Sequence, residues 1–164
     1  MRIVGTDLDR PSSTQLRAMQ FGYASLIPFA LAAILIWMTP GLFTYELAMS
    51  FIGWVLIYGA IVVSFLGGAR WGVAIRDWRP DRLIFTAFPL LLGWAAVVPN
   101  QLLPGLGMGS TVRFGILLVA FLFLLTTELL ARNEWSPWYR GLRMRLTLAT
   151  TGFLLLTILG LTRF

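Results

Sequence analysis

The sequence predicts an all-α integral membrane protein, a bundle of about five transmembrane helices in a single domain covering residues 1–164. Hydrophobic residues make up 58% of the chain and charged residues only 12%, whereas a soluble domain has roughly 25% charged residues. Several runs with few charges reach the ~20 residues that cross ~30 Å of hydrocarbon. Because these runs take up nearly the whole length, no separate soluble domain is expected.

The first span is expected over about residues 19–38. Pro11-Ser-Ser-Thr14 is typical of a helix start, and Thr39-Pro-Gly41 of a helix end. We expect Pro28 to bend or loosen this helix, because proline removes one backbone hydrogen bond. The apolar run is long for a cleaved signal peptide, and two nearby Asp residues argue against a mitochondrial presequence. The segment is therefore expected to stay in the membrane.

Two further spans are expected over about residues 48–74 and 83–101. Thr44 can cap the first of them, since a threonine side chain accepts a hydrogen bond from the first helical turn. Pro89 interrupts the second.

The last two spans are expected over about residues 111–131 and 144–162. A glycine-rich link over 104–109 precedes the first of them. Ser136 and Pro137 suit the N-cap and the first position of the final helix.

Arginine residues alternate between the two sides of the predicted bundle. One side holds Arg2, Arg10, Arg17, Arg76, Arg79, Arg82, Arg132, Arg140, Arg143 and Arg145, and the other holds Arg113 and Arg163. By the positive-inside rule, the N-terminus is cytoplasmic and the C-terminus lies across the membrane. We expect the bacterial inner (cytoplasmic) membrane. The net charge of +6 sits at helix ends and not on one soluble face, which argues against a nucleic-acid partner.

The amino-acid composition excludes several kinds of reactive and metal-binding site. The chain has no Cys and no His, which removes disulfides, thiolate chemistry, histidine-ligated haem and the usual zinc sites. It has no paired carboxylates, nucleophile elbow, P-loop or metal-ligand spacing. We therefore expect a protein that is not an enzyme, with no catalytic residue, no metal and no cofactor.

Small residues recur through the second span. Ala60, Ser64, Gly68 and Gly72 stand at every fourth place, with Gly67 beside them. On an α-helix a step of four advances the face by only ~40°, so they form a slowly winding ridge. Close backbone approach drives helix packing in lipid, which predicts a packing seam here. A partner helix in the same chain is favoured over a homodimer, because a G-x-x-x-G motif does not specify which helix approaches.

Two charges lie within the apolar runs. Arg70 costs roughly 2.5–3.5 kcal/mol at a helix centre. It either faces a buried anion or acid, or reaches the cytoplasmic headgroups near Arg76, ~9 Å further along the helix. Glu128 could pair with Arg70 across helices or with Arg132 one turn on, and the local pair is favoured. Because the outer half of the bundle has no titratable groups, a proton relay is poorly supported.

An aromatic and basic cluster precedes the last span. It comprises Trp135, Trp138, Tyr139, Arg140 and Arg143. The rings share one helix face, which predicts an anchor at the cytoplasmic interface with the arginines directed to phosphates. A specific anionic-lipid site is the sharper alternative.

Three segments resemble a known family. Leu26-Ile-Pro-Phe29, Ser64-Phe-Leu-Gly-Gly-Ala-Arg-Trp-Gly72 and Trp138-Tyr-Arg-Gly-Leu-Arg143 are similar to the transmembrane protein 69-like family (domain of unknown function 3429), of which the second segment is the most specific. The resemblance covers nearly the whole chain and implies the same order of spans. Members occur in bacteria and as predicted mitochondrial membrane proteins, and no biochemical activity is established for them. Members often have His or another polar residue where this chain has Arg70, and this departure argues against any role that needs a titratable imidazole.

The leading functional hypothesis is a non-enzymatic scaffold, assembly or accessory subunit. Its expected partners are membrane lipids, and other membrane proteins or a second copy of the chain. The alternative is a small-solute transporter or channel that uses Arg70 near the cytoplasmic side and the proline-interrupted spans. A membrane enzyme acting on lipid or quinone is a third class, resting only on Arg70, Trp71 and Glu128 at headgroup depth.

Overall fold

The computed structural model describes residues 12–78, 80–99, 108–130 and 136–163. Its regular structure is helical throughout this part of the chain. The helices are α1 (Ser13–Ala24), α2 (Ile27–Met38), α3 (Tyr45–Arg76), α4 (Pro80–Val97), α5 (Ser110–Leu130) and α6 (Pro137–Leu161). The predicted all-α membrane bundle is confirmed.

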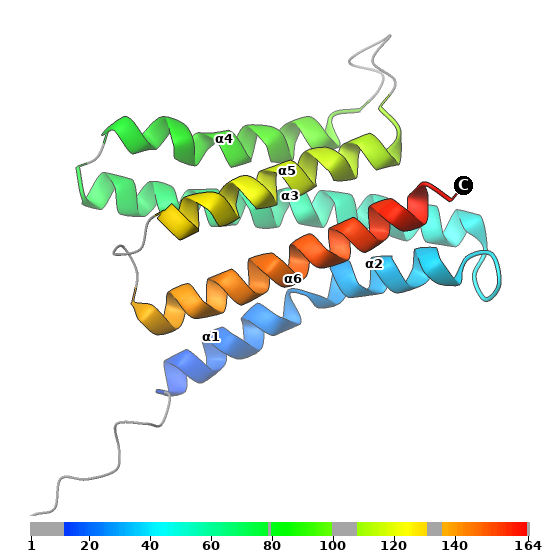
Figure 1. The fold of residues 1–164 in the computed structure, drawn as a ribbon, viewed down its shortest axis with the longest axis horizontal. Coiled ribbons are helices and arrows are strands. Elements are labelled where there is room, and N and C mark those ends of the chain that lie inside the picture. The colour runs from blue at the N-terminus through cyan, green and yellow to red at the C-terminus, as the bar shows by residue number, and fades with distance from the viewer. Residues whose placement is uncertain (1–11, 79, 100–107, 131–135, 164) are drawn as a thin grey trace, which may run out of the picture.

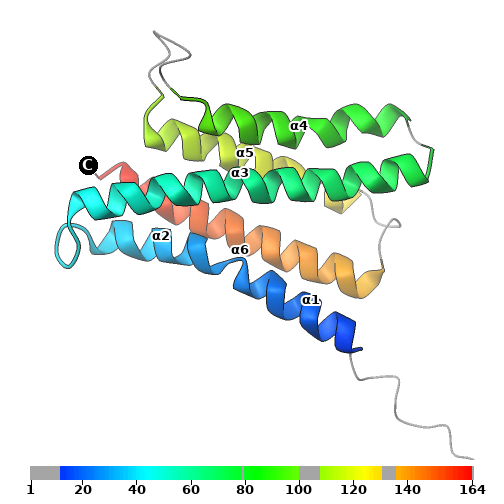
Figure 2. The same cartoon turned by 180° about the vertical axis from the view of Figure 1, so that it is seen from behind.

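The helices lie side by side and run in alternating directions (Figures 1 and 2). Four segments of the described chain are long and apolar enough to cross a membrane: α1 with α2, α3, α5 and α6. Helix α4 contributes a shorter apolar stretch, Leu83–Val97. We call the end where α1 and α6 begin the α1 end, and the end where α2 and α6 finish the α2 end (Figure 1). The described chain therefore starts and finishes at opposite ends of the bundle.

The first span is interrupted earlier than predicted. Helix α1 ends at Ala24, α2 begins at Ile27, and Pro28 lies in the first turn of α2. A proline ring clashes with the carbonyl four residues before it and disfavours helix at the preceding residue. The helix therefore stops at Ala24, and Pro28 starts a new helix instead of bending a continuous one.

Helix α3 is the longest of the described helices, at 32 residues. As predicted, Thr44 caps it, accepting a hydrogen bond from the backbone N–H of Leu47 at 3.4 Å. It ends at Arg76 with Asp77 as its C-cap, and Trp78 follows with φ 51°, a left-handed conformation that ends helices.

One apolar core runs between α2, α3, α5 and α6. Its largest fully buried side chains include Phe29, Ile36, Ile52, Phe114 and Phe121. The ring of Phe29 meets that of Phe121 edge-on, with centroids 6.0 Å apart, a favoured aromatic geometry. Helix α4 packs on the outside, against α3 and α5.

Candidate functional site

Part of the predicted small-residue seam lies against α4. A Cβ added at Gly93 of α4 would lie 3.2 Å from the backbone oxygen of Ala60 and 3.6 Å from Ser64 Oγ. One added at Gly67 would lie 3.1 Å from the backbone oxygen of Thr86. The backbones of α3 and α4 therefore approach closely over Ala60, Ser64 and Gly67, as small residues allow in a membrane.

The other two residues of that seam lie elsewhere. Gly68 and Gly72 are exposed, and a Cβ added at either would meet nothing within 4 Å. Residues spaced by four rotate around the helix by ~40° at each step, whereas the contact line with a neighbouring helix follows an average spacing near 3.5 residues. The contact with α4 therefore passes from Ser64 to Gly67, three residues on. Of the predicted seam, Ala60, Ser64 and Gly67 therefore pack within this chain, whereas Gly68 and Gly72 do not.

The buried acid Glu128 pairs with Arg143, a residue that was predicted to lie at the membrane interface. The Nε of Arg143 donates to Oε1 of Glu128 at 2.7 Å, and Nη2 lies 2.6 Å from the same oxygen. The two side chains are only 4% and 2% exposed. The predicted Arg70–Glu128 pair is thus corrected to Arg143–Glu128, between α6 and α5. The other predicted partner, Arg132, lies outside the described residues.

Arg70 also approaches α5. Its Nη2 donates to the backbone oxygen of Thr127 at 3.3 Å, one residue before Glu128. Two arginines, from α3 and α6, thus meet the last turns of α5. This position suits a cation, because the C-terminal end of a helix carries partial negative charge.

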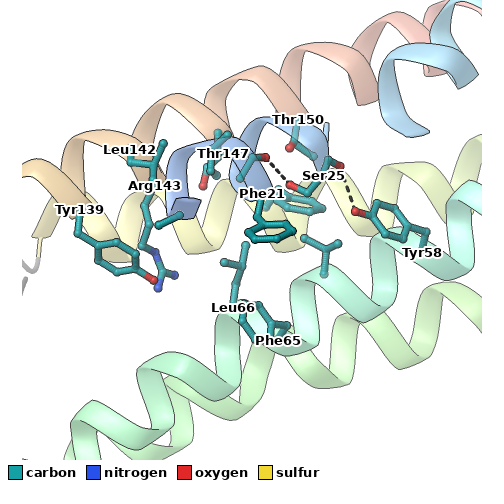
Figure 3. A pocket seen from close by; sticks show the side chains of 15 residues that line it. Phe21, Ser25, Tyr58, Phe65, Leu66, Tyr139, Leu142, Arg143, Thr147 and Thr150 are labelled. Carbon is teal, nitrogen blue, oxygen red and sulfur yellow. Dashed lines mark hydrogen bonds between the residues drawn. The ribbon is translucent and has the colours of Figure 1, made fainter. Parts of the chain in front are cut away.

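The predicted interface anchor divides into two parts. Trp138, Tyr139 and Arg140 are half-buried at the start of α6, and the rings of Trp138 and Tyr139 lie 5.5 Å apart. Arg143, by contrast, points into the bundle, with its guanidinium carbon 5.8 Å from the Tyr139 ring centroid (Figure 3). The assignment of Arg143 to the interface was therefore wrong, and Trp135 lies outside the described residues.

A buried polar stripe along α6 escaped the sequence analysis. It comprises Arg143, Thr147, Thr150, Thr151 and Thr157. Positions 143, 147, 150, 154 and 157 follow the spacing of one helix face, which was the available signal. Thr151 and Thr157 donate to backbone oxygens one turn earlier, at 2.8 and 2.9 Å. Threonines can satisfy themselves inside a membrane helix in this way.

Comparisons with known proteins place this architecture among uncharacterised membrane proteins. The model of a family described as protein of unknown function (DUF3429) matches residues 14–159. Transmembrane protein 69 of Xenopus tropicalis is 33% identical over 135 residues, which cover 79% of this chain and 49% of the frog protein. Its Mus musculus counterpart is 29% identical over 136 residues, 80% of this chain and 51% of the mouse protein. The chain thus spans about half the length of these curated relatives. No solved structure matches it.

Proposed function

The chain belongs to the DUF3429 family of unknown function, and from that premise we propose that it is a non-enzymatic scaffold, assembly or accessory subunit. It is a multi-pass membrane protein, since it has several apolar helices of spanning length and is similar to proteins named transmembrane protein.

The observation that carries the proposal is the outer face of α3. We define this face by Ile61, Phe65, Gly68, Gly72 and Ile75, whose side chains or Cα atoms are exposed on one side of the helix. The two glycines form a shallow notch between large apolar side chains, because a Cβ there would meet nothing within 4 Å. A transmembrane helix of another protein can approach most closely at such a notch.

The buried charges support a structural role and not a chemical one. The carboxylate of Glu128 is held by Arg143 deep between α5 and α6. A buried pair of this kind fixes the register of two helices. It therefore serves the shape of the bundle, which a scaffold needs.

We further propose that the membrane is the bacterial inner membrane and that the α1 end is cytoplasmic. Arg17, Arg76 and Arg145 belong to the α1 end, whereas Arg113 and Arg163 belong to the α2 end. This imbalance favours a cytoplasmic α1 end. A reporter that is active only in the periplasm, fused after Phe164, is expected to be active. A silent, well-expressed fusion would contradict the orientation.

Co-purification from mild detergent tests the scaffold proposal. Wild-type protein is expected to bring a defined membrane partner, and Gly68→Leu is expected to lose it because the leucine fills the notch. Gly53→Leu is the matched control, since Gly53 lies on the same helix, is exposed and is equally open around its Cβ position. A solitary monomer in the wild type and in Gly68→Leu alike would contradict the proposal.

A further inference from the structure

A cavity of about 430 Å³ lies at the α1 end, between α1, α3, α5 and α6 (Figure 3). This volume is within the roughly 300–1,000 Å³ of small-molecule sites. Most of its wall is apolar, built by Phe21 and Leu146 on one side and by Val62, Leu66 and Phe121 on the other. A hydrocarbon chain is the ligand that such a wall accommodates.

The cavity opens sideways, between α1 and α3. Phe21 of α1 is 75% exposed and Phe65 of α3 is 72% exposed, and both line the cavity. Helix α1 buries none of its residues, and its main contact is with α6. Both rings lie on segments of membrane-spanning length, so we expect a ligand to enter from the bilayer.

Polar groups line the α6 wall of the same cavity. Arg143, Thr147 and Thr150 are all more than nine-tenths buried, and all contribute to the lining. The hydroxyls of Thr151 and Thr157 donate to backbone oxygens, but those of Thr147 and Thr150 donate to none of the described residues. Because both residues line the cavity, their hydroxyls are suited to donate to a ligand there.

The charges in the cavity wall favour an uncharged amphiphile over an anionic one. The positive charge of Arg143 is balanced by Glu128 at 2.6 Å, so the pair adds no net charge to the wall. An anionic headgroup would gain little here and would lose its hydration. An uncharged oxygen acceptor needs only the two hydroxyl donors.

We propose that this cavity binds an uncharged amphiphile, a long apolar chain carrying a carbonyl oxygen that accepts hydrogen bonds from Thr147 and Thr150. The ester carbonyl of a neutral glycerolipid and the ring carbonyl of an isoprenoid quinone share this chemistry. Neither Gly68 nor Gly72 lines this site, although its rim residue Phe65 also belongs to the outer face of α3. Its occupancy therefore does not depend on the scaffold proposal.

Photolabelling of the full chain in nanodiscs of a dialkyl ether phosphatidylcholine, a lipid that has no ester carbonyl, tests this site. The probes are a diacylglycerol and an isoprenoid quinone, each with a diazirine in its apolar chain, and adducts are mapped by mass spectrometry. Saturable labelling is expected on peptides that contain the cavity residues. Competition by unlabelled diacylglycerol or by unlabelled quinone distinguishes the two sources of the carbonyl.

Two pairs of variants make the test specific. Ala18→Trp fills the cavity from α1 and is expected to abolish saturable labelling, whereas Gln20→Trp, on an exposed position of the same helix that does not line the cavity, is expected to keep it. The double variant Thr147→Val with Thr150→Val is expected to weaken competition about tenfold, as loss of two hydrogen bonds predicts. Thr151→Val, outside the lining, is its control.

Labelling that Ala18→Trp leaves unchanged would overturn the site. Stronger competition by phosphatidic acid than by both uncharged ligands would overturn the assigned class.

Discussion

The two halves of the first span pack differently against the same neighbour, α6. Helix α2 buries Phe29, Ala32, Ala33 and Ile36, whereas α1 buries none of its residues. Near the α2 end, Nε1 of Trp37 donates to the backbone oxygen of Leu156 at 2.9 Å, and Arg163 lies 4.9 Å from the Trp37 ring centroid. Near the α1 end, the space between the helices is the cavity.

The difference follows from which side chains α6 presents. Toward α2 it offers Gly160, over which Ile36 packs closely. Toward α1 it offers Leu146, which lies over Gly22. Toward the cavity beside it lie Arg143 and Thr147, whose polar groups cannot be covered by apolar side chains without cost. One helix therefore supports a closed core at one end and an accessible site at the other.

Loss of the Arg143–Glu128 ion pair is expected to have the largest effect on the stability of the bundle. Arg143→Met leaves the Glu128 carboxylate buried and uncompensated, and is expected to lower the free energy of unfolding by about 3–5 kcal/mol. Unfolding in sodium dodecyl sulfate, followed by circular dichroism, measures it. Arg145→Met, on an exposed position, is expected to change stability by less than about 0.5 kcal/mol. Adding Glu128→Leu to Arg143→Met is expected to recover part of the loss. A loss no larger than that of Arg145→Met would show that the α1 end does not depend on the pair.

Two glycine variants compare the tightly packed α2 end with the cavity at the α1 end. A Cβ added at Gly160 would lie 2.5 Å from Cγ2 of Ile36, a stiff β-branched side chain in the core. Gly160→Ala is therefore expected to cost about 1–3 kcal/mol. At Gly22 the added Cβ would lie 2.7 Å from Cδ1 of Leu146, which can turn into the cavity. Gly22→Ala is expected to be neutral or to stabilise by up to about 1 kcal/mol. Equal losses in the same assay would contradict the contrast.

The smallest expected effect concerns the break between the two halves. The hydroxyl of Tyr58 donates to the backbone oxygen of Ser25 at 3.1 Å, and an unpaired backbone oxygen is costly in a membrane. Tyr58→Phe is expected to cost about 0.5–1.5 kcal/mol and to speed hydrogen–deuterium exchange around residues 21–27. Tyr23→Phe, on an exposed ring, is the control and should change neither. Unchanged exchange in Tyr58→Phe would show that the break is held by packing alone.

Much of the fold could be predicted because local signals agreed with the final packing. The apolar composition predicted a membrane bundle, and Thr44 capped α3 as expected. The close approach of Ala60, Ser64 and Gly67 to α4 also followed from small-residue spacing.

The partners of the buried charges could not be predicted from local spacing. Glu128 had one candidate partner at a favourable helical interval and another on a different span, yet it binds Arg143, fifteen residues away. The choice depends on which face of α6 turns inward, and that is decided by packing with α5. Arg143 was assigned to the interface because aromatic rings surround it in the sequence. Its alignment with Thr147 and Thr150 was the better guide.

The length of α3 has a consequence for the lipid around the molecule. At ~1.5 Å per residue its 32 residues extend ~48 Å, and the 18 residues of its neighbour α4 extend ~27 Å. A bilayer with a hydrocarbon layer of ~30 Å cannot match both helices at once. We expect α3 to tilt, or the surrounding acyl chains to stretch along one flank and shorten along the other. An uneven hydrophobic height of this kind would sort lipids of different chain length around the protein.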